Sequence, residues 1–147
     1  MDLVELKDVY KIKQAPRILY RLLAERPKLA NISHRKMPSF YQHQAFVTSR
    51  PYKAWYLIQA SSQGFVGGVY LSKSDEIGIF VFKQCRRKGY GQKAVSLLMN
   101  RHRGVRRFLA NINPKNNRSI QFFKGLKFRH IQNTYEFRRQ EQKGRGI

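Results

Sequence analysis

Residues 76–91 read Glu76-Ile77-Gly78-Ile79-Phe80-Val81-Phe82-Lys83-Gln84-Cys85-Arg86-Arg87-Lys88-Gly89-Tyr90-Gly91, and they decide how this chain is expected to fold. The first half is largely apolar, which is typical of a central strand that is buried on both faces. The second half is a basic turn with a Gly-x-Gly pattern, and apolar residues at helical spacing follow it. The stretch therefore predicts a strand, a turn and a helix in succession.

The Gly-x-Gly turn is a candidate anion site. A turn that leads from a strand into a helix presents unpaired backbone N–H groups and the positive end of the helix dipole. Gly89 and Gly91 lack side chains, so phosphate oxygens could approach the backbone, and Arg86, Arg87 and Lys88 add positive charge. The turn predicts a pyrophosphate site, and the alternative is a plain turn with solvated basic residues. Neither the GxGxxG dinucleotide pattern nor the Gly-Lys-Ser/Thr ending of a P-loop is present.

The residues before this stretch predict two helices and three strands. Residues 16–26 carry leucines at helical spacing between two prolines, and residues 39–49 carry a weaker helical pattern after a capping serine. Residues 55–60 and 65–71 are rich in branched and aromatic side chains, which predicts two antiparallel strands. Residues 3–6 predict an edge strand.

The residues after the stretch predict two more helices and three more strands. Residues 92–101 continue the turn into an amphipathic helix, and residues 107–112 predict another strand. Residues 119–124 predict a short helix. Residues 127–131 and 134–138 predict a closing hairpin around a short turn.

Length and composition favour one globular domain. The chain has 147 residues, of which 41% are hydrophobic and 13% aromatic, enough for one packed core. We expect this domain to span residues 1–139. Residues 140–147 are polar and basic, and we expect them to be a frayed tail.

The net charge points to a polyanionic partner. Thirty Lys and Arg residues against eight acids give a formal charge of +22. No acid occurs between Glu76 and Glu136, whereas residues 83–129 hold fourteen basic residues. This predicts a basic face that binds nucleic acid or a nucleoprotein, and the alternative is that the charge serves solubility.

Other site classes receive no support from the sequence. Cys85 is the one cysteine, which excludes an internal disulfide, and we favour a small packed side chain over a reactive thiol. His34, His43, His102 and His130 lack the spacing of metal ligands, so no metal is expected. No signal peptide and no run of eighteen apolar residues is present, so we expect a soluble, cytoplasmic protein without membrane contact.

Two motifs together resemble one known family. Residues 76–81 followed by Arg86-x-x-Gly89-x-Gly91 resemble the coenzyme-binding motif of the Gcn5-related N-acetyltransferase (GNAT) superfamily. Asn113-Pro114-x-Asn116-x-x-Ser119-Ile120-x-Phe122-Phe123-x-x-Leu126-x-Phe128 resembles its second motif. The resemblance spans residues 55–128. It implies an α/β (α+β) fold with a mixed, mostly antiparallel sheet of about six to seven strands and about four helices, in which splayed central strands form the coenzyme cleft.

The resemblance also implies where an acyl-CoA, expected to be acetyl-CoA, would bind as co-substrate. Residues 80–82 would meet the pantetheine arm, the amides of residues 86–91 would hold the pyrophosphate, and Asn116 would contact the arm through its side chain. The expected coenzyme-binding residues are Phe80, Val81, Phe82, Arg86, Arg87, Lys88, Gly89, Tyr90, Gly91, Asn116 and Phe123.

Acetyl transfer to an amine needs a base, a donor to the oxyanion and an acid for the leaving thiolate. The resemblance suggests Glu76 as the base, and the alternative is an ordinary solvated acid at the start of a strand. A backbone N–H near Val81 or Phe82 would donate to the oxyanion.

The expected general acid departs from the family pattern. The position of the family's tyrosine is Phe123, which has no proton to give, so the acid would be Ser119, a nearby tyrosine such as Tyr135, or water. A second departure is Lys127, which stands where the family usually has glycine and is expected to affect only a turn.

The acceptor is expected to approach between the N-terminal helices and the strand ends. Residues 31–41 interleave basic and aromatic side chains there, which suits stacking on bases and contact with phosphates. The leading hypothesis is an N-acyltransferase whose acceptor is associated with nucleic acid. The alternatives are a catalytically idle nucleic-acid-binding module with the same fold, and an enzyme for a small amine.

Overall fold

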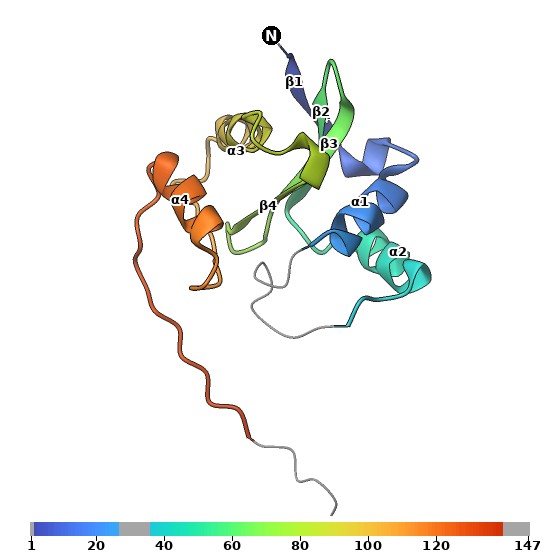
Figure 1. Cartoon of the computed structure of the whole chain (residues 1–147). Coiled ribbons are helices and arrows are strands. Elements are labelled where there is room, and N and C mark those ends of the chain that lie inside the picture. Colours follow the sequence, from blue (N-terminus) through green and yellow to red (C-terminus); the bar gives the residue numbers. More distant parts are fainter. Residues whose placement is uncertain (1, 27–35, 140–147) are drawn as a thin grey trace, which may run out of the picture.

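The computed structural model describes residues 2–26 and 36–139 of the chain. Four α-helices and four strands follow one another in the order shown in Figure 1. The elements are β1 (Val4–Asp8), α1 (Ala15–Ala24), α2 (Phe40–Thr48), β2 (Ala54–Ala60), β3 (Gly64–Leu71), β4 (Ile77–Val81), α3 (Tyr90–Arg101) and α4 (Asn117–Gly125). Short 3-10 turns follow β1 and β4, at Val9–Lys11 and Lys83–Cys85.

The sheet is an antiparallel meander in which the spatial order of the strands is their order in the chain, β1-β2-β3-β4. Leu57 and Ile58 on β2 are fully buried, and Val66 and Val69 on β3 are buried with them. These branched side chains fit a pleated surface that is covered on both sides. The predicted strands 55–60 and 65–71 are thus confirmed within one residue at each end.

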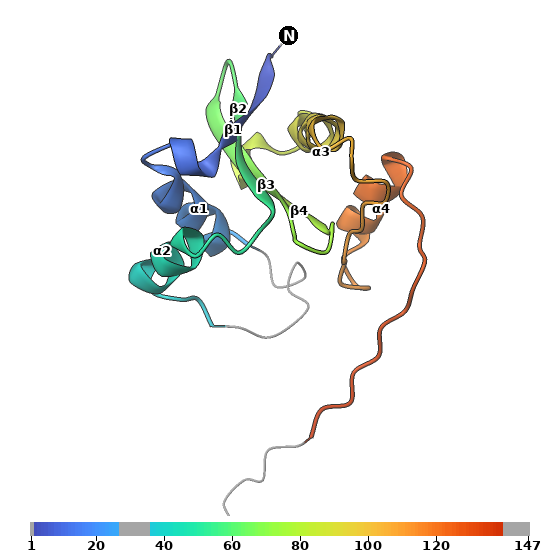
Figure 2. The ribbon, with the colours of Figure 1, turned by 180° about the vertical axis from the view of Figure 1, so that it is seen from behind.

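Helices cover both faces of this sheet, and the two opposite views in Figures 1 and 2 show the same division. α1 and α2 lie on one face, where a β-carbon built on Gly68 would stand 3.3 Å from Leu19 of α1. α3 lies on the other face and buries Ala94, Val95 and Leu98. The core is therefore divided by the sheet into two apolar layers.

The N-terminal helices form where their local signals predict them. Pro16 stands in the first turn of α1, where its missing N–H costs nothing. Ser39 caps α2 in a reciprocal capping box with Gln42, each side chain accepting from the other residue's backbone N–H. Tyr10, in the 3-10 turn after β1, donates its hydroxyl to the carbonyl of Val47 in α2 at 2.8 Å and so links this turn to α2.

The predicted strand at 107–112 is wrong, because only one bridge forms there. Ile77 donates its N–H to the carbonyl of Leu109 at 2.7 Å, and Leu109 donates to the carbonyl of Asp75 at 2.9 Å, which gives a parallel bridge between Glu76 and Leu109. Beyond the bridge the segment leaves β4 for a turn closed by the bond from Asn116 N–H to the carbonyl of Asn113. β4 and residues 109–116, called the two arms of the site below, therefore diverge after the bridge, as the resemblance implies.

The predicted closing hairpin is also wrong. Residues 129–139 form no strand and run extended away from the body in Figures 1 and 2. Tyr135 is 89% exposed and Phe137 84% exposed, and a hairpin without a surface to pack on is at best marginally stable. The described residues accordingly form a four-stranded sheet rather than one of six to seven strands. The α/β class, the antiparallel sheet and the four helices are confirmed.

Candidate active site

The outer edge of β4 is the first element of the site. Phe82 donates its N–H to the carbonyl of Val66 on β3 at 2.8 Å, whereas Ile77 donates in the opposite direction, to Leu109. In an antiparallel ladder, successive residues alternate between the two sides. Ile79 and Val81 therefore direct their backbone N–H and C=O groups away from β3, and no described segment pairs with this edge beyond the bridge at Glu76.

This alternation corrects the expected contribution of residues 80–82. The N–H of Phe82 is already paired with Val66, so Phe82 cannot be the oxyanion donor. Phe80 pairs with Gly68 on β3 in the same phase. Val81 keeps an N–H at the open edge, while its carbonyl accepts from Arg86 Nε at 3.3 Å. Ile79 was missed in the sequence because the phase of the ladder depends on the neighbouring strand.

The turn after β4 leads directly into the N-terminus of α3. Arg87 and Gly89 both have positive φ, 66° and 78°, and Gly89 is the N-cap without a side-chain cap. The first intrahelical bond runs from Lys93 N–H to the carbonyl of Gly89, so the N–H groups of residues 90–92 have no partner within the helix. Successive amides in such a turn form a concave anion site.

Both ends of this turn are fixed by carboxylates from distant segments. Glu25, which follows α1, accepts the N–H of Lys83 at 2.8 Å. Asp2 accepts the hydroxyl of Tyr90 on Oδ2 and the N–H of Ser62 on Oδ1. The hydrogen bonds from Ser62 and Tyr90 hold the pKa of Asp2 well below its ordinary value, and donation to Asp2 raises the pKa of Tyr90. The buried side chain of Tyr90 is therefore an anchor, which leaves its backbone N–H for an anion.

The two glycines of the turn have different roles. A β-carbon on Gly89 would meet nothing within 4 Å, so the backbone there is open to a ligand. A β-carbon on Gly91 would stand 3.1 Å from the ring of Phe122 and 3.8 Å from Val81. Gly91 thus makes room for α4 to pack on α3, which corrects the expectation that its missing side chain faces phosphate.

The basic residues of the turn are mostly solvated. Arg86 is half-buried and contacts the carbonyl of Val81, whereas Arg87 and Lys88 are exposed beside the turn. Cys85 is a free, buried cysteine, which confirms the small packed side chain.

The second motif forms α4 and the turn before it. Asn116 is the N-cap of α4, and its Oδ1 accepts the N–H of Ser119 at 3.2 Å. Phe123 is buried against Phe122 and Phe128, with ring centroids 5.0 and 5.1 Å apart, so it packs within the protein instead of offering a free ring to the coenzyme.

The departure at Lys127 coincides with a strained position. Lys127 has a φ of 72°, in the left-handed region that a glycine adopts more easily. The residue lies in the turn that ends α4, as the sequence predicts.

Glu76 lies where β4 and the 109–112 segment diverge. Its Oε2 accepts from Asn111 Nδ2 and its Oε1 accepts from Ser72 Oγ at 3.3 Å. Ser119 is half-buried at the start of α4, and its hydroxyl makes no described hydrogen bond. Tyr135 is 89% exposed on the extended C-terminal segment, and the structure does not bring it to Glu76.

The expected acceptor side is described in part. Residues 31–35 lie outside the described residues. Phe40 packs edge-on against Tyr20 at 5.5 Å and under the guanidinium of Arg17 at 4.9 Å, whereas Lys36 and Tyr41 are exposed. Tyr41, at 80% exposure, is therefore the described aromatic side chain of this segment that could stack on a ligand.

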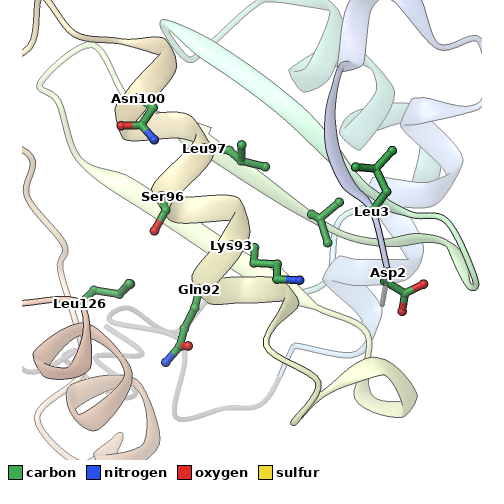
Figure 3. A pocket seen from close by; sticks show the side chains of 9 residues that line it. Asp2, Leu3, Gln92, Lys93, Ser96, Leu97, Asn100 and Leu126 are labelled. Atoms are coloured by element: carbon green, nitrogen blue, oxygen red, sulfur yellow. The ribbon is translucent and has the colours of Figure 1, made fainter.

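A shallow hollow of about 540 Å³ lies over the exposed side of α3, between the N-terminal strand and α4 (Figure 3). Its lining is mixed polar and apolar, and none of the expected site residues takes part. The lining residues are Asp2, Leu3, Val4, Gln92, Lys93, Ser96, Leu97, Asn100 and Leu126.

Two further observations concern other kinds of site. In residues 2–26 and 36–139, no group of three or more His, Cys, Asp or Glu side chains could hold a metal ion. None of the helices in the same residues has the length and apolar character that crossing a bilayer requires.

The family model of the acetyltransferase (GNAT) domain matches residues 3–129. Among solved structures, the chain resembles an acetyltransferase from Thermus thermophilus, with 17% identity and a TM-score of 0.70 over 88% of this chain and 89% of that one. It also resembles the aminoglycoside N-acetyltransferase AAC(6')-Iy in complex with CoA, with 15% identity and a TM-score of 0.65 over 95% of each chain.

A third similar structure is a ribosomal-protein-alanine N-acetyltransferase from Brucella melitensis, with 15% identity and a TM-score of 0.63 over 94% of this chain and 99% of that one. No curated protein sequence matches the chain. The structural likenesses show the shared fold, and the family match covers most of the chain. The chain therefore belongs to the GNAT family of acetyltransferases and is an enzyme of the N-acetyltransferase class.

Proposed function

We propose that this enzyme transfers an acetyl group from acetyl-CoA to an amine carried by a nucleic acid or a nucleoprotein. The observation that carries the coenzyme assignment is the open edge of β4 directly before the uncapped N-terminus of α3. Free backbone N–H and C=O groups along this edge could form hydrogen bonds with the amide groups of an extended ligand. The backbone N–H groups at the start of α3 could bind a diphosphate. Pantetheine and pyrophosphate are joined in that order in coenzyme A.

Chain residues would supply the base and the oxyanion donor, and the acid would be Ser119 or water. Glu76 would take a proton from the amine that attacks the thioester carbon, directly or through water, and the N–H of Val81 would donate to the carbonyl oxygen as it becomes an oxyanion. Collapse of that intermediate breaks the carbon–sulfur bond, and the thiolate takes up a proton from Ser119 or water. Phe123 has no acidic proton, and Tyr135 is exposed on the C-terminal segment that runs away from the body.

The nucleic-acid part of the proposal is supported by unneutralised charge. Of the fourteen basic residues in 83–129, all but Arg86 are exposed. The described ion pairs are Lys7–Glu5, Lys53–Asp75 and Arg138–Glu136, so none of the fourteen takes part in one. Such a surface attracts phosphate backbones, and its affinity should fall steeply with salt.

A second candidate function is a nucleic-acid-binding module that retains the coenzyme fold without turnover. The buried Phe123 at the position of the family's tyrosine favours it, because the expected acid is missing. Both candidates predict salt-dependent binding of nucleic acid. Release of CoA from acetyl-CoA in the presence of an acceptor separates them.

The test of the coenzyme site is calorimetric titration of the nucleic-acid-free protein with acetyl-CoA. Gly89→Glu places a carboxylate among the amides that would hold pyrophosphate, and we expect the affinity to fall by about 100-fold or more. Gly64→Glu is a matched control, because Gly64 has the same φ of 78° and equally open space, but is the first residue of β3.

Equal loss of affinity in both variants would mean that backbone strain, and not a carboxylate in the anion site, causes the effect. No binding by the parent protein, in calorimetry and in an independent fluorescence assay, would overturn the acetyl-CoA assignment.

A further inference from the structure

We propose that Ser72 and Asn111 are positioning residues that hold the carboxylate of Glu76 at the opening between the two diverging arms of the site. The inference rests on the proposed function, in which Glu76 is the general base. It adds two residues that lie outside both family motifs, one on each side of Glu76.

Ser72 holds Glu76 from the β3–β4 turn through three contacts. Its N–H donates to the carbonyl of Glu76 at 2.8 Å, and its Oγ accepts the N–H of Glu76 at 2.9 Å. The same Oγ donates to Glu76 Oε1 at 3.3 Å. The turn between the two residues contains Asp75 with a φ of 63°. Backbone and side chain of Glu76 are thus fixed by one residue.

Asn111 holds Glu76 from the opposite arm. The bridge at Leu109 aligns this arm with the start of β4, and Asn111 follows two residues later, where the pleat returns to the same side. Its Nδ2 donates to Glu76 Oε2. The carboxylate therefore spans the point where the arms separate, with one oxygen directed to each side.

The hydrogen bonds around Glu76 are more typical of a general base than of a carboxylate in a structural ion pair. Each carboxylate oxygen accepts one described hydrogen bond, although it has room for about two. Both donors are neutral, and no described ion pair includes Glu76. The carboxylate is therefore oriented while it keeps acceptor capacity for the amine or a bridging water. Misplacement of a catalytic group by about 1 Å can cost on the order of 100-fold in rate.

The kinetic test uses Asn111→Ala and Ser72→Ala with acetyl-CoA and water as the acceptor, so that the products are acetate, a proton and CoA thiol. We expect the rate constant for thiol release to fall about tenfold in each variant, which is less than the 10²–10⁴-fold that general-base catalysis contributes as a whole, because the base is displaced and not removed. The dissociation constant for acetyl-CoA should stay unchanged. Asn133→Ala, which alters an exposed asparagine of the C-terminal segment, is the matched control.

A double-mutant cycle distinguishes positioning from a structural role. If Asn111 acts through Glu76, then Asn111→Ala should have no further effect in a Glu76→Gln background. A merely structural role would give the same fold-loss in both backgrounds, together with a lower melting temperature. That result, or unchanged thiol release in the single variants, would overturn the proposal.

A spectroscopic test does not depend on turnover. The side-chain amide protons of Asn111 should shift as one carboxyl group titrates, and this shift should vanish in Glu76→Gln. Asp75, which pairs with Lys53, and the hydroxyl of Tyr70 are the neighbouring titratable groups, and they remain in that variant. If the Asn111 amide signals show the same pH dependence in the parent and in Glu76→Gln, the inference is overturned even when acetyl-CoA binds. Failure of acetyl-CoA to bind would instead overturn the proposed function.

Discussion

The turn at residues 82–91 and the C-terminal segment at residues 129–139 have a similar residue composition but different structures. Both combine basic residues with aromatic ones. The turn is tied to Glu25 at one end and to Asp2 at the other, and its Gly91 packs under Phe122. In the C-terminal segment, the described side-chain bonds join residues that are two positions apart in the chain. Basic and aromatic residues therefore take up a fixed arrangement only where contacts with distant segments hold the backbone.

The largest effect is expected from filling the contact between α3 and α4. Gly91→Leu would place a side chain where a β-carbon alone stands 3.1 Å from Phe122. Overpacking of this kind costs about 3 kcal/mol of unfolding free energy, measured by urea denaturation. Gly104→Leu is the control, because a β-carbon there meets nothing within 4 Å. Equal effects of the two substitutions would contradict the close contact.

The next effect is expected from releasing the amino-terminal anchor of α3. Tyr90→Phe removes the hydroxyl that donates to Asp2 but keeps the buried ring. Loss of this hydrogen bond to a charged acceptor should lower the unfolding free energy by less than Gly91→Leu does, and acetyl-CoA affinity should fall with it because the turn is no longer held. Tyr41→Phe, the control, removes a phenol hydroxyl from an exposed side chain and should leave the unfolding free energy and the acetyl-CoA affinity unchanged.

The same anchor predicts a pH dependence. The folded pKa of Asp2 is depressed, chiefly by its hydrogen bonds from Ser62 and Tyr90, so its stabilising effect is present above the unfolded value of about 3.9 and is lost as the pH falls through the folded pKa. The difference in unfolding free energy between the parent and Asp2→Asn should therefore shrink from pH 7 to pH 3. A constant difference over this range would contradict the depressed pKa.

The smallest effect is expected in the C-terminal segment. Tyr135→Ser combined with Phe137→Ser alters side chains that are 89% and 84% exposed, so the unfolding free energy should change by less than about 0.5 kcal/mol. Acetyl-CoA affinity should also stay constant. A clear loss of stability would show that these side chains are buried in solution and that the comparison between the two regions is wrong.

Local sequence signals predicted most of the elements near the site. The strand at β4, the turn and the helix α3 follow from one continuous stretch, and the capping serine Ser39 predicted the start of α2. The signals failed where a segment needs a partner. Residues 107–112 are apolar enough for a strand, yet after the bridge at Leu109 they diverge from β4.

The site residues show the same limit. The positions of Gly89 and Val81 followed from the motif. The Phe82 N–H is occupied by the carbonyl of Val66, and Ile79 faces the open edge, because of the way in which β4 pairs with β3. No residue of β4 specifies by itself which of its backbone groups face β3. Asn111 and Ser72 carried no signal at all, because their relevance comes from their contacts with Glu76.

The sequence by itself determined the family, the order of the four helices and the first four strands, and the basic character of the surface, because apolar periodicity, glycine positions and charge are properties of the chain. The tertiary structure decided which backbone groups remain free, which glycine faces a ligand and which packs on Phe122, and what holds Glu76. These outcomes depend on hydrogen bonds and contacts between segments far apart in the chain. Such contacts are set by packing of the whole domain and not by any local pattern.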